Sequence, residues 1–350
     1  MSFQRFLTSL ATVVVIATIS RTLALNVVNS YRDPHGNPLL SMDYEPQTGV
    51  LVVSSSKSVA KLNSELYLED ITSCKLKFSG IQNIVINKDL ESVILCSSAE
   101  GRCNVNSLEE LNKELQVHPS QLLPKSLGSN SSAVLLLTSA QTMLIANDFF
   151  RSSRNTVSVP MLSSRSTINL SLMHASAQAA SAKYVTNLRN LPQAYSVMYS
   201  YAFVYKNFAY LVSRVSDVKK PFISSRISRL CLDDKSFTSY VEISLGCGKD
   251  TSISYPTHST VQTAYFDQVS TKLFVSFANN GQGDLSSAVC GFKLHDLDLH
   301  MDKAVYDCST GKGKLGPAHF QKQRKCFKTV SYSENISAIF LVIDCFNMVL

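Results

Sequence analysis

The chain contains no tryptophan, and charged residues make up only 17% of its 350 residues. So few charges, combined with 45% apolar residues, exclude a disordered segment. The excess of 33 Lys and Arg over 26 Asp and Glu gives a formal net charge of +7, which is too diffuse to indicate nucleic-acid binding. Helical periodicity is scarce, whereas serine and β-branched residues are plentiful. This composition favours strands and turns over a helical bundle.

Motifs of catalytic and metal sites are also missing. The chain has no Gly-x-Ser-x-Gly elbow and no Cys-x-x-Cys pair. The segment from His295 to His300 (His-Asp-Leu-Asp-Leu-His) offers two imidazoles and two carboxylates. A metal site needs three or four converging ligands, and the start of a surface helix has the same residue types. We therefore predict no enzyme activity, no metal and no other cofactor.

The first residues have the layout of a secretory signal peptide. Arg5 supplies a positive start, Leu7 to Ile19 is apolar, and Thr22-Leu-Ala24 places small residues at a cleavage site. The apolar run is shorter than the roughly 20 residues that a membrane-spanning helix needs. We therefore predict a signal peptide over residues 1–24, no membrane span in this chain, and entry into the secretory pathway.

The cysteines and the N-glycosylation sequons are consistent with a secreted protein. An extracellular chain with many cysteines pairs most of them, and the odd number leaves at least one without a partner inside the chain. Three Asn-x-Ser sequons predict surface glycans at Asn130, Asn169 and Asn335. The nine cysteines are Cys74, Cys96, Cys103, Cys231, Cys247, Cys290, Cys308, Cys326 and Cys345.

Short apolar runs joined by turn residues predict a series of antiparallel hairpins. Hairpins that recur every few tens of residues favour a β-propeller, and a β-sandwich of similar strand content stays open as the alternative. Two short helices are predicted, over Ser107–Leu115 and Asp296–Ala304. The predicted hairpins pair 84–86 with 93–96, 133–137 with 143–146, 195–205 with 208–215, and 261–266 with 273–277 followed by 288–294.

One segment carries a family resemblance. Residues 223–247 read as a strand ending in Arg229-Leu-Cys231, an acidic turn, and then Ser239-Tyr-Val-Glu-Ile-Ser-Leu-Gly-Cys247. This pattern resembles the Sema domain of plexins, the cell-surface receptors for semaphorins. Semaphorins themselves have a different, Lys/Trp-containing segment there, and the hepatocyte growth factor receptor family has a similar version. Further segments that resemble plexins in the same order are 48–53 with 59–66, 95–103, 160–166, 262–265 and 288–294.

The resemblance runs from about Leu39 to about Phe327 and implies a seven-bladed β-propeller. A plexin Sema domain is longer than this chain, so we expect an incomplete propeller with five to six blades over residues 25–328, followed by a divergent tail over residues 329–350. A propeller without closure leaves two faces between blades bare. The expected behaviour of such a product is aggregation or retention in the secretory pathway.

The resemblance also implies disulfides. It pairs Cys96 with Cys103, Cys247 with Cys290, and Cys308 with Cys326. Cys231 would pair with a cysteine downstream of Cys326, where only Cys345 is available, so its partner stays open.

By this resemblance the chain is a semaphorin-binding receptor domain at the cell surface or outside the cell, acting in cell and axon guidance. Three alternatives stay open: a soluble secreted decoy, a domain of growth-factor-receptor type, and a secreted propeller enzyme acting on glycans with Asp296 and Asp298. A homodimer is a further candidate assembly, and nucleic acid is not expected as a partner. A basic cluster is either a solvated loop or a contact for glycosaminoglycans or an acidic ligand face; its members are Lys312, Lys314, Lys322, Arg324, Lys325 and Lys328.

Overall fold

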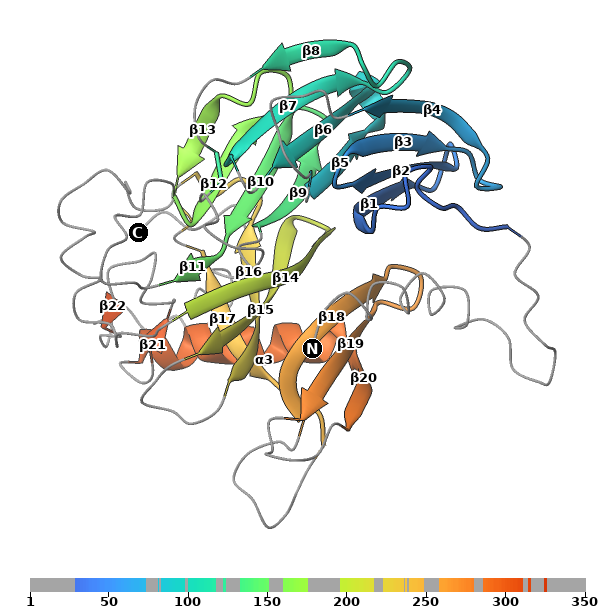
Figure 1. Cartoon of the computed structure of the whole chain (residues 1–350). Helices are drawn as coiled ribbons and strands as arrows, with labels where there is room; N and C mark the ends of the chain where they lie inside the picture. Colours follow the sequence, from blue (N-terminus) through green and yellow to red (C-terminus); the bar gives the residue numbers. More distant parts are fainter. Residues whose placement is uncertain are drawn as a thin grey trace. The chain divides into compact units, whose positions relative to one another are not determined.

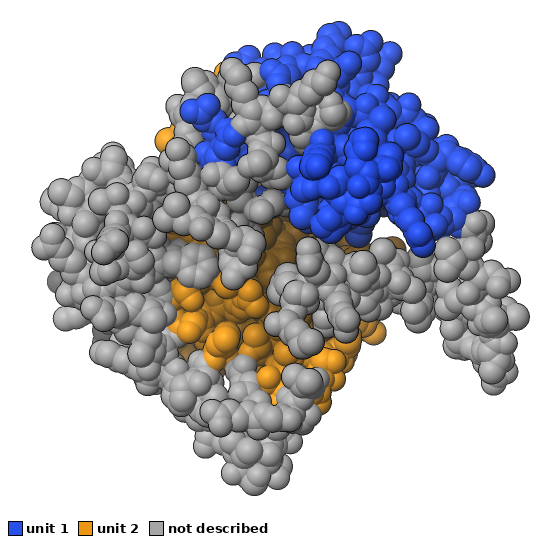
Figure 2. All heavy atoms as spheres, viewed as in Figure 1, with its two compact units in different colours: residues 1–120, 125–127 blue, residues 121–124, 128–350 orange. Residues whose placement is uncertain are grey.

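A computed structural model describes residues 29–73, 81, 83–97, 100–117, 122–123, 133–150, 160–175, 196–216, 223–235, 237, 239–248, 258–279, 286–310, 314–315 and 324–325. The predicted signal peptide and the predicted tail lie outside these residues. The chain divides into two compact units, one of residues 1–120 and 125–127 and one of residues 121–124 and 128–350, coloured blue and orange in Figure 2.

Unit 1 contains two four-stranded antiparallel sheets, each with its strands in chain order. We call them blade 1 and blade 2 (Figure 1). The turn between the first two strands requires glycine at position 49, because its φ is +71° and a Cβ there would lie 2.8 Å from the Cβ of Ser64. Blade 1 consists of β1 (Leu39–Glu45), β2 (Val50–Ser55), β3 (Ser58–Leu62) and β4 (Leu68–Ser73); blade 2 consists of β5 (Asn83–Asn87), β6 (Ser92–Ser97), β7 (Arg102–Ser107) and β8 (Glu114–Val117).

Unit 2 contains antiparallel sheets of four, five and three strands, which we call blades 3, 4 and 5 (Figure 1). Blade 3 consists of β9 (Ala133–Ser139), β10 (Thr142–Asn147), β12 (Leu162–Ser166) and β13 (Leu172–Ala175). Blade 4 consists of β11 (Phe149–Phe150), β14 (Ser196–Tyr205), β15 (Phe208–Ser216), β16 (Ser224–Cys231) and β17 (Val241–Leu245). Blade 5 consists of β18 (His258–Asp267), β19 (Lys272–Asn279) and β20 (Ser287–Lys293), and a short pair, β21 (Lys314–Leu315) and β22 (Arg324–Lys325), follows it.

These sheets bear out the predicted fold class. The described residues form an all-β propeller fold with five blades, within the predicted five to six, and the predicted hairpins fall in the predicted places. Successive side chains of a strand point to opposite faces of its sheet, so one strand can supply apolar residues to the clusters on both faces. Blades 4 and 5 share an apolar cluster in which the ring of Phe203 stacks on those of Tyr210 and Phe266, at 4.8 and 4.2 Å between centroids.

The helix predicted over Asp296–Ala304 is present and longer. It is α3 (Leu294–Ser309), which contacts β17 and β20. Leu294, Leu297 and Met301 are buried in the cluster of blades 4 and 5, and this spacing puts them on one face of a helix.

The prediction of a helix over Ser107–Leu115 is wrong. Ser107 ends β7, and its hydroxyl accepts the backbone N–H groups of Glu109 and Glu110 at 3.2 and 3.4 Å. The N–H of Leu111 bonds instead to a carboxylate oxygen of Asp70 in blade 1, at 2.9 Å. Side-chain oxygens therefore accept the backbone N–H groups of this segment and hold it as a turn.

Both faces of blade 1 carry apolar side chains, and the second face is buried on its central strands β2 and β3 and exposed on its edge strands β1 and β4. The face with Val52 and Val59 packs on blade 2. Register places Met42 beside Val53 and Ile71 beside Ala60 on the opposite face, so that face carries apolar side chains from all four strands. Its exposed members are Met42, Tyr44, Leu68 and Ile71.

Blade 5 buries one face and exposes apolar side chains on the other. Phe266, Val275 and Phe277 pack toward blade 4. Tyr265 pairs with Phe274 on the other face, where Tyr265 and Val289 are 60% and 71% exposed.

Candidate binding site between the third and fourth blades

The plexin-like segment forms β16, the following turn and β17. The turn is held by side chains of the pattern itself. Asp234 accepts the N–H of Ser239 at 2.5 Å, and the Ser239 hydroxyl accepts the N–H of Cys231 at 2.9 Å. Tyr240 donates its hydroxyl to Glu242 at 3.0 Å, and Glu242 also pairs with Arg226 of β16. The pattern is therefore a set of mutually bonded residues that fixes the edge of blade 4.

Tyr240 is fully packed into this edge. Burial, followed by the nearby Glu242 carboxylate, raises the pKa of Tyr240 well above its ordinary value. The hydroxyl therefore stays protonated and serves as a hydrogen-bond donor.

Arg229, also in the plexin-like pattern, joins β16 to α3. Its guanidinium donates to Asp298 at 2.8 Å and to Asp302 at 2.6 Å, and it lies 4.6 Å from the ring centroid of Phe208. Burial alone would lower the pKa of Arg229, but the two carboxylates outweigh it and raise the pKa. Tyr210 donates to the same Asp298 carboxylate at 3.0 Å.

A cavity of about 210 Å³ opens where blade 3 meets this turn. Strands β9, β10, β12 and β13 supply one wall, and the end of β16 with its turn supplies the other. Its lining residues are Thr138, Thr142, Leu144, Ser164, Met173, His174, Leu230, Leu232, Asp233, Asp234, Lys235 and Phe237.

The lining has an apolar floor and a polar rim. Leu144, Leu230 and Phe237 are buried in the cluster of blades 3 and 4. Asp233 is exposed, and its carboxylate accepts no hydrogen bond from another residue in the described part of the chain. The hydroxyl of Ser164 is buried and has no hydrogen-bond partner among the described residues. Such a concave site can take an amphipathic side chain of a partner and bond its polar end.

Sequence reasoning located only part of this site. The plexin-like pattern includes an acidic turn, and the structure shows that both of its aspartates line the cavity, whereas Asp234 also accepts the N–H of Ser239 within the turn. The blade 3 wall was missed, because its hydroxyls and His174 become neighbours of the acidic turn only through the stacking of two sheets.

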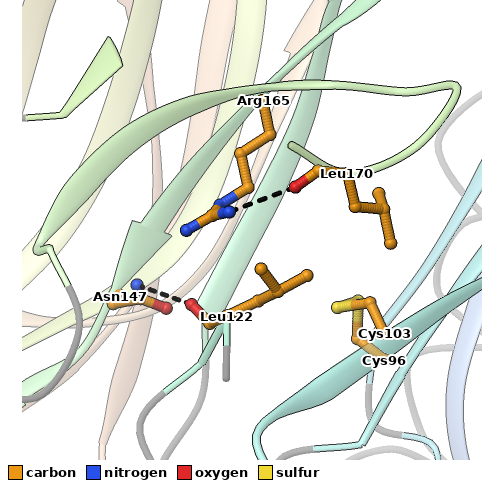
Figure 3. Close-up of a disulfide and its surroundings, with 6 residues drawn as sticks. All are labelled: Cys96, Cys103, Leu122, Asn147, Arg165 and Leu170. Atoms are coloured by element: carbon orange, nitrogen blue, oxygen red, sulfur yellow. Dashed lines mark hydrogen bonds between the residues drawn. A yellow bond between two sulfur atoms is a disulfide. The ribbon is translucent and has the colours of Figure 1, made fainter. Parts of the chain in front are cut away.

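Two disulfides lie in the described residues, and each joins two cysteines that the resemblance pairs. Cys96 and Cys103 join neighbouring strands of blade 2, with Cα atoms 4.1 Å apart (Figure 3), and Cys247 and Cys290 join blades 4 and 5, with Cα atoms 5.9 Å apart. Cys308 is disulfide-bonded at the end of α3, and its implied partner Cys326 lies outside the described residues. Cys231 is buried at the end of β16; Cys74 and Cys345 lie outside the described residues.

The other predicted site residues are scattered. Asn169 is exposed on the turn between β12 and β13, whereas Asn130 and Asn335 fall outside the described residues. Asp298, a carboxylate of the enzyme alternative, is engaged by Arg229 and Tyr210, and the carbonyl of Asp296 lies 2.7 Å from Nδ1 of His300. No cluster of three metal-binding side chains, and no helix long and apolar enough to span a membrane, occurs in the described residues.

Known proteins similar to this chain are plexins and their structural neighbours. No protein-family model matches the chain. Plexin A3 of Danio rerio is 29% identical in an alignment of 162 residues that covers 39% of this chain and 8% of that protein. Plexin-A3 of Homo sapiens is 25% identical in an alignment of 169 residues that covers 42% of this chain and 9% of that protein. The matches thus span less than a tenth of these curated relatives.

Solved structures agree on the fold. The full extracellular region of plexin A4 superposes with a TM-score of 0.63 at 18% identity, covering 84% of this chain and 38% of that one. Drosophila Semaphorin 2a superposes with a TM-score of 0.53 at 13% identity, covering 79% of this chain and 49% of that one. The chain is therefore a distant homologue of the plexins over part of its length, and it has the propeller fold of a Sema domain.

Proposed function

We propose that the chain is a semaphorin-binding domain of plexin type that acts in semaphorin–plexin signalling and has no catalytic activity of its own. The observation that carries the proposal is the segment from Arg229 to Glu242. It has the plexin-type residues where semaphorins have a different segment, and those residues bond to one another at the edge of blade 4. Distant plexin homology supports the same assignment.

The cavity between blades 3 and 4 is the proposed point of contact. Affinity between proteins is concentrated in a few side chains that enter pockets, with polar groups at the rim fixing their orientation. The apolar floor at Leu144 and Phe237 and the exposed carboxylate of Asp233 supply these two components. A partner side chain with an aliphatic stem and a polar end fits such a lining.

We propose an extracellular or cell-surface location, with the signal peptide over residues 1–24 and the Sema region over residues 25–328. The disulfides between Cys96 and Cys103 and between Cys247 and Cys290 support an oxidising compartment. Sequencing the N-terminus of the secreted protein tests the signal peptide, and a mature chain that retains residues before Leu25 would exclude the proposed cleavage.

Binding of purified chain to a panel of semaphorins, with hepatocyte growth factor as a second class of ligand, tests the function. Asp233→Lys is expected to weaken semaphorin binding at least tenfold, about 1.4 kcal/mol. Asp296→Lys is the matched control, because it changes an exposed carboxylate on α3 outside the cavity lining. Binding of the growth factor alone would favour the growth-factor-receptor alternative. Turnover on a glycan panel that is lost in the Asp296 and Asp298 variants would favour the enzyme.

A glycosaminoglycan is a second candidate ligand. Strands β21 and β22 pair so that Lys314 stands opposite Lys325 and Leu315 opposite Arg324. This pairing gathers three basic residues from two segments of the chain. We expect elution from heparin at lower salt when the three are changed to serine, and unchanged elution would exclude this contact.

A further inference from the structure

The turn between β12 and β13 presents the one predicted glycan acceptor that lies in the described part of the chain. Ile168 and Asn169 are exposed at this turn, and Ser171 completes the sequon. The hairpin belongs to blade 3, and Met173 on the strand that follows it lines the cavity described above.

The rest of the turn is firmly anchored. Leu170 is fully buried in the left-handed region, with a φ of 58°, and its carbonyl accepts a hydrogen bond from Arg165 at 3.1 Å (Figure 3). The hydroxyl of Thr167 donates to the carbonyl of Ala140 in the neighbouring β9–β10 turn at 2.6 Å. Residues on both sides of Asn169 are therefore held in place while its side chain faces solvent.

The Asn169 amide is oriented by its own sequon. Its Oδ1 accepts the N–H of Ser171 at 3.0 Å, as in an Asx turn. Nδ2 donates to no group within the described residues, so the nitrogen that would carry a sugar is available. Glycosylation keeps the Oδ1 acceptor, and the folded turn therefore accommodates the modified side chain without losing this hydrogen bond.

We propose that Asn169 carries an N-linked oligosaccharide that stands beside the cavity of blades 3 and 4. The co-reactant is a lipid diphosphate-linked oligosaccharide. Nδ2 of Asn169 forms a bond to C1 of the first sugar, the bond from C1 to the diphosphate oxygen breaks, and the lipid diphosphate leaves while Nδ2 loses one proton to a base of the transferase. The inference rests on the proposed passage through the secretory pathway.

The test compares Ser171→Thr, which keeps the sequon, with Ser171→Ala, which removes it and leaves Asn169 in place. Each chain is expressed in secreting cells, and the whole cellular and secreted pools are digested with a peptide N-glycosidase that converts a glycosylated Asn to Asp. Peptide mass spectrometry then reads Asn130, Asn169 and Asn335 separately. Measuring the cellular pool keeps the test valid when a variant is not exported.

We expect glycosylated Asn169 in the wild-type chain and in Ser171→Thr, and unmodified Asn169 in Ser171→Ala. Modified Asn130 or Asn335 together with unmodified Asn169 in the wild type would overturn this inference alone. An unmodified set of all three sequons with an uncleaved N-terminus would overturn the secretory location as well.

Discussion

Arg229 of β16 and Asp298 of α3 form an ion pair of 2.8 Å that ties the helix following blade 5 to the third main strand of blade 4. The arginine side chain is almost completely buried, and Asp302, one turn further along α3, binds its second terminal nitrogen at 2.6 Å. A buried guanidinium is costly unless it is paired, so the two carboxylates explain why an arginine is tolerated at this position.

Arg229→Met is expected to destabilise unit 2 by about 1–3 kcal/mol, because it removes two charge-assisted hydrogen bonds and leaves two carboxylates close together. Urea denaturation of the purified chain measures this. Lys303→Met is the matched control, because it breaks the exposed pair of Lys303 with Asp307 and is expected to change stability by less than about 1 kcal/mol. Equal effects of the two substitutions would show that Arg229 does not anchor α3.

The two disulfides are expected to contribute unequally. The Cys247–Cys290 bridge spans 43 residues and the Cys96–Cys103 bridge spans 7. The loop-closure relation gives about 4 and about 2.5 kcal/mol of stabilisation, respectively. Replacing both cysteines of each bridge with alanine and comparing urea midpoints tests the order, and a larger loss from the Cys96–Cys103 replacement would contradict it.

Asp33 is expected to make the stability of unit 1 sensitive to acid. Burial would raise the pKa of Asp33, but hydrogen bonds from Ser58, Ser55 and Asn37 outweigh it and hold the pKa below its ordinary value. Because the folded pKa is depressed, the stabilisation is complete above the unfolded pKa of about 4 and is lost as pH falls through the folded pKa.

Unfolding free energies measured from pH 6 downward test this dependence. Asp33→Asn is expected to lower stability at pH 6 and to flatten the decline below about pH 4. Ser58→Ala, which removes the 2.6 Å hydrogen bond, is expected to flatten the decline in part. If the unfolding free energy of Asp33→Asn falls at low pH as steeply as that of the wild type, other groups cause the acid sensitivity.

The exposed face of blade 5 is expected to promote self-association of the purified chain. Paired substitution of Tyr265 and Val289 by lysine removes apolar contact area from side chains that are 60% and 71% exposed, so it is expected to reduce association without loss of stability. Val269→Lys is the control, because Val269 is 96% exposed on the β18–β19 turn. Sedimentation velocity measures the mass distribution, and association unchanged by the paired substitution would exclude this face as the cause.

The local spacing of apolar and turn residues was sufficient to predict the hairpins and α3. The hairpin at Lys206-Asn207 and the helix from Leu294 follow from alternating or helical spacing of apolar residues next to turn residues. The helix prediction for the segment after Ser107 was wrong, because a carboxylate of blade 1 and the Ser107 hydroxyl accept the backbone N–H groups that a helix would use. Tertiary contacts of this kind are not encoded in local periodicity.

The candidate site, too, depends on tertiary contacts that the sequence does not reveal. The plexin-like residues from Arg229 to Glu242 could be read from the chain, but the partners of Arg229 lie on α3, many residues later. The cavity needs Ser164 and His174 from blade 3 as well as Asp233 from blade 4. Both aspartates of the turn line the cavity, and only the side-chain geometry shows that Asp234 also bonds within the turn.

Binding to semaphorins is the property that the proposed function requires. The purified chain, shown to be folded and monodisperse, is passed over immobilised semaphorins of several classes, together with Asp233→Lys and Asp296→Lys. We expect saturable binding to at least one semaphorin, weakened at least tenfold by Asp233→Lys and unchanged by Asp296→Lys. Absence of binding to every semaphorin by the folded chain would contradict the proposed function, and equal binding by both variants would exclude the cavity as the point of contact.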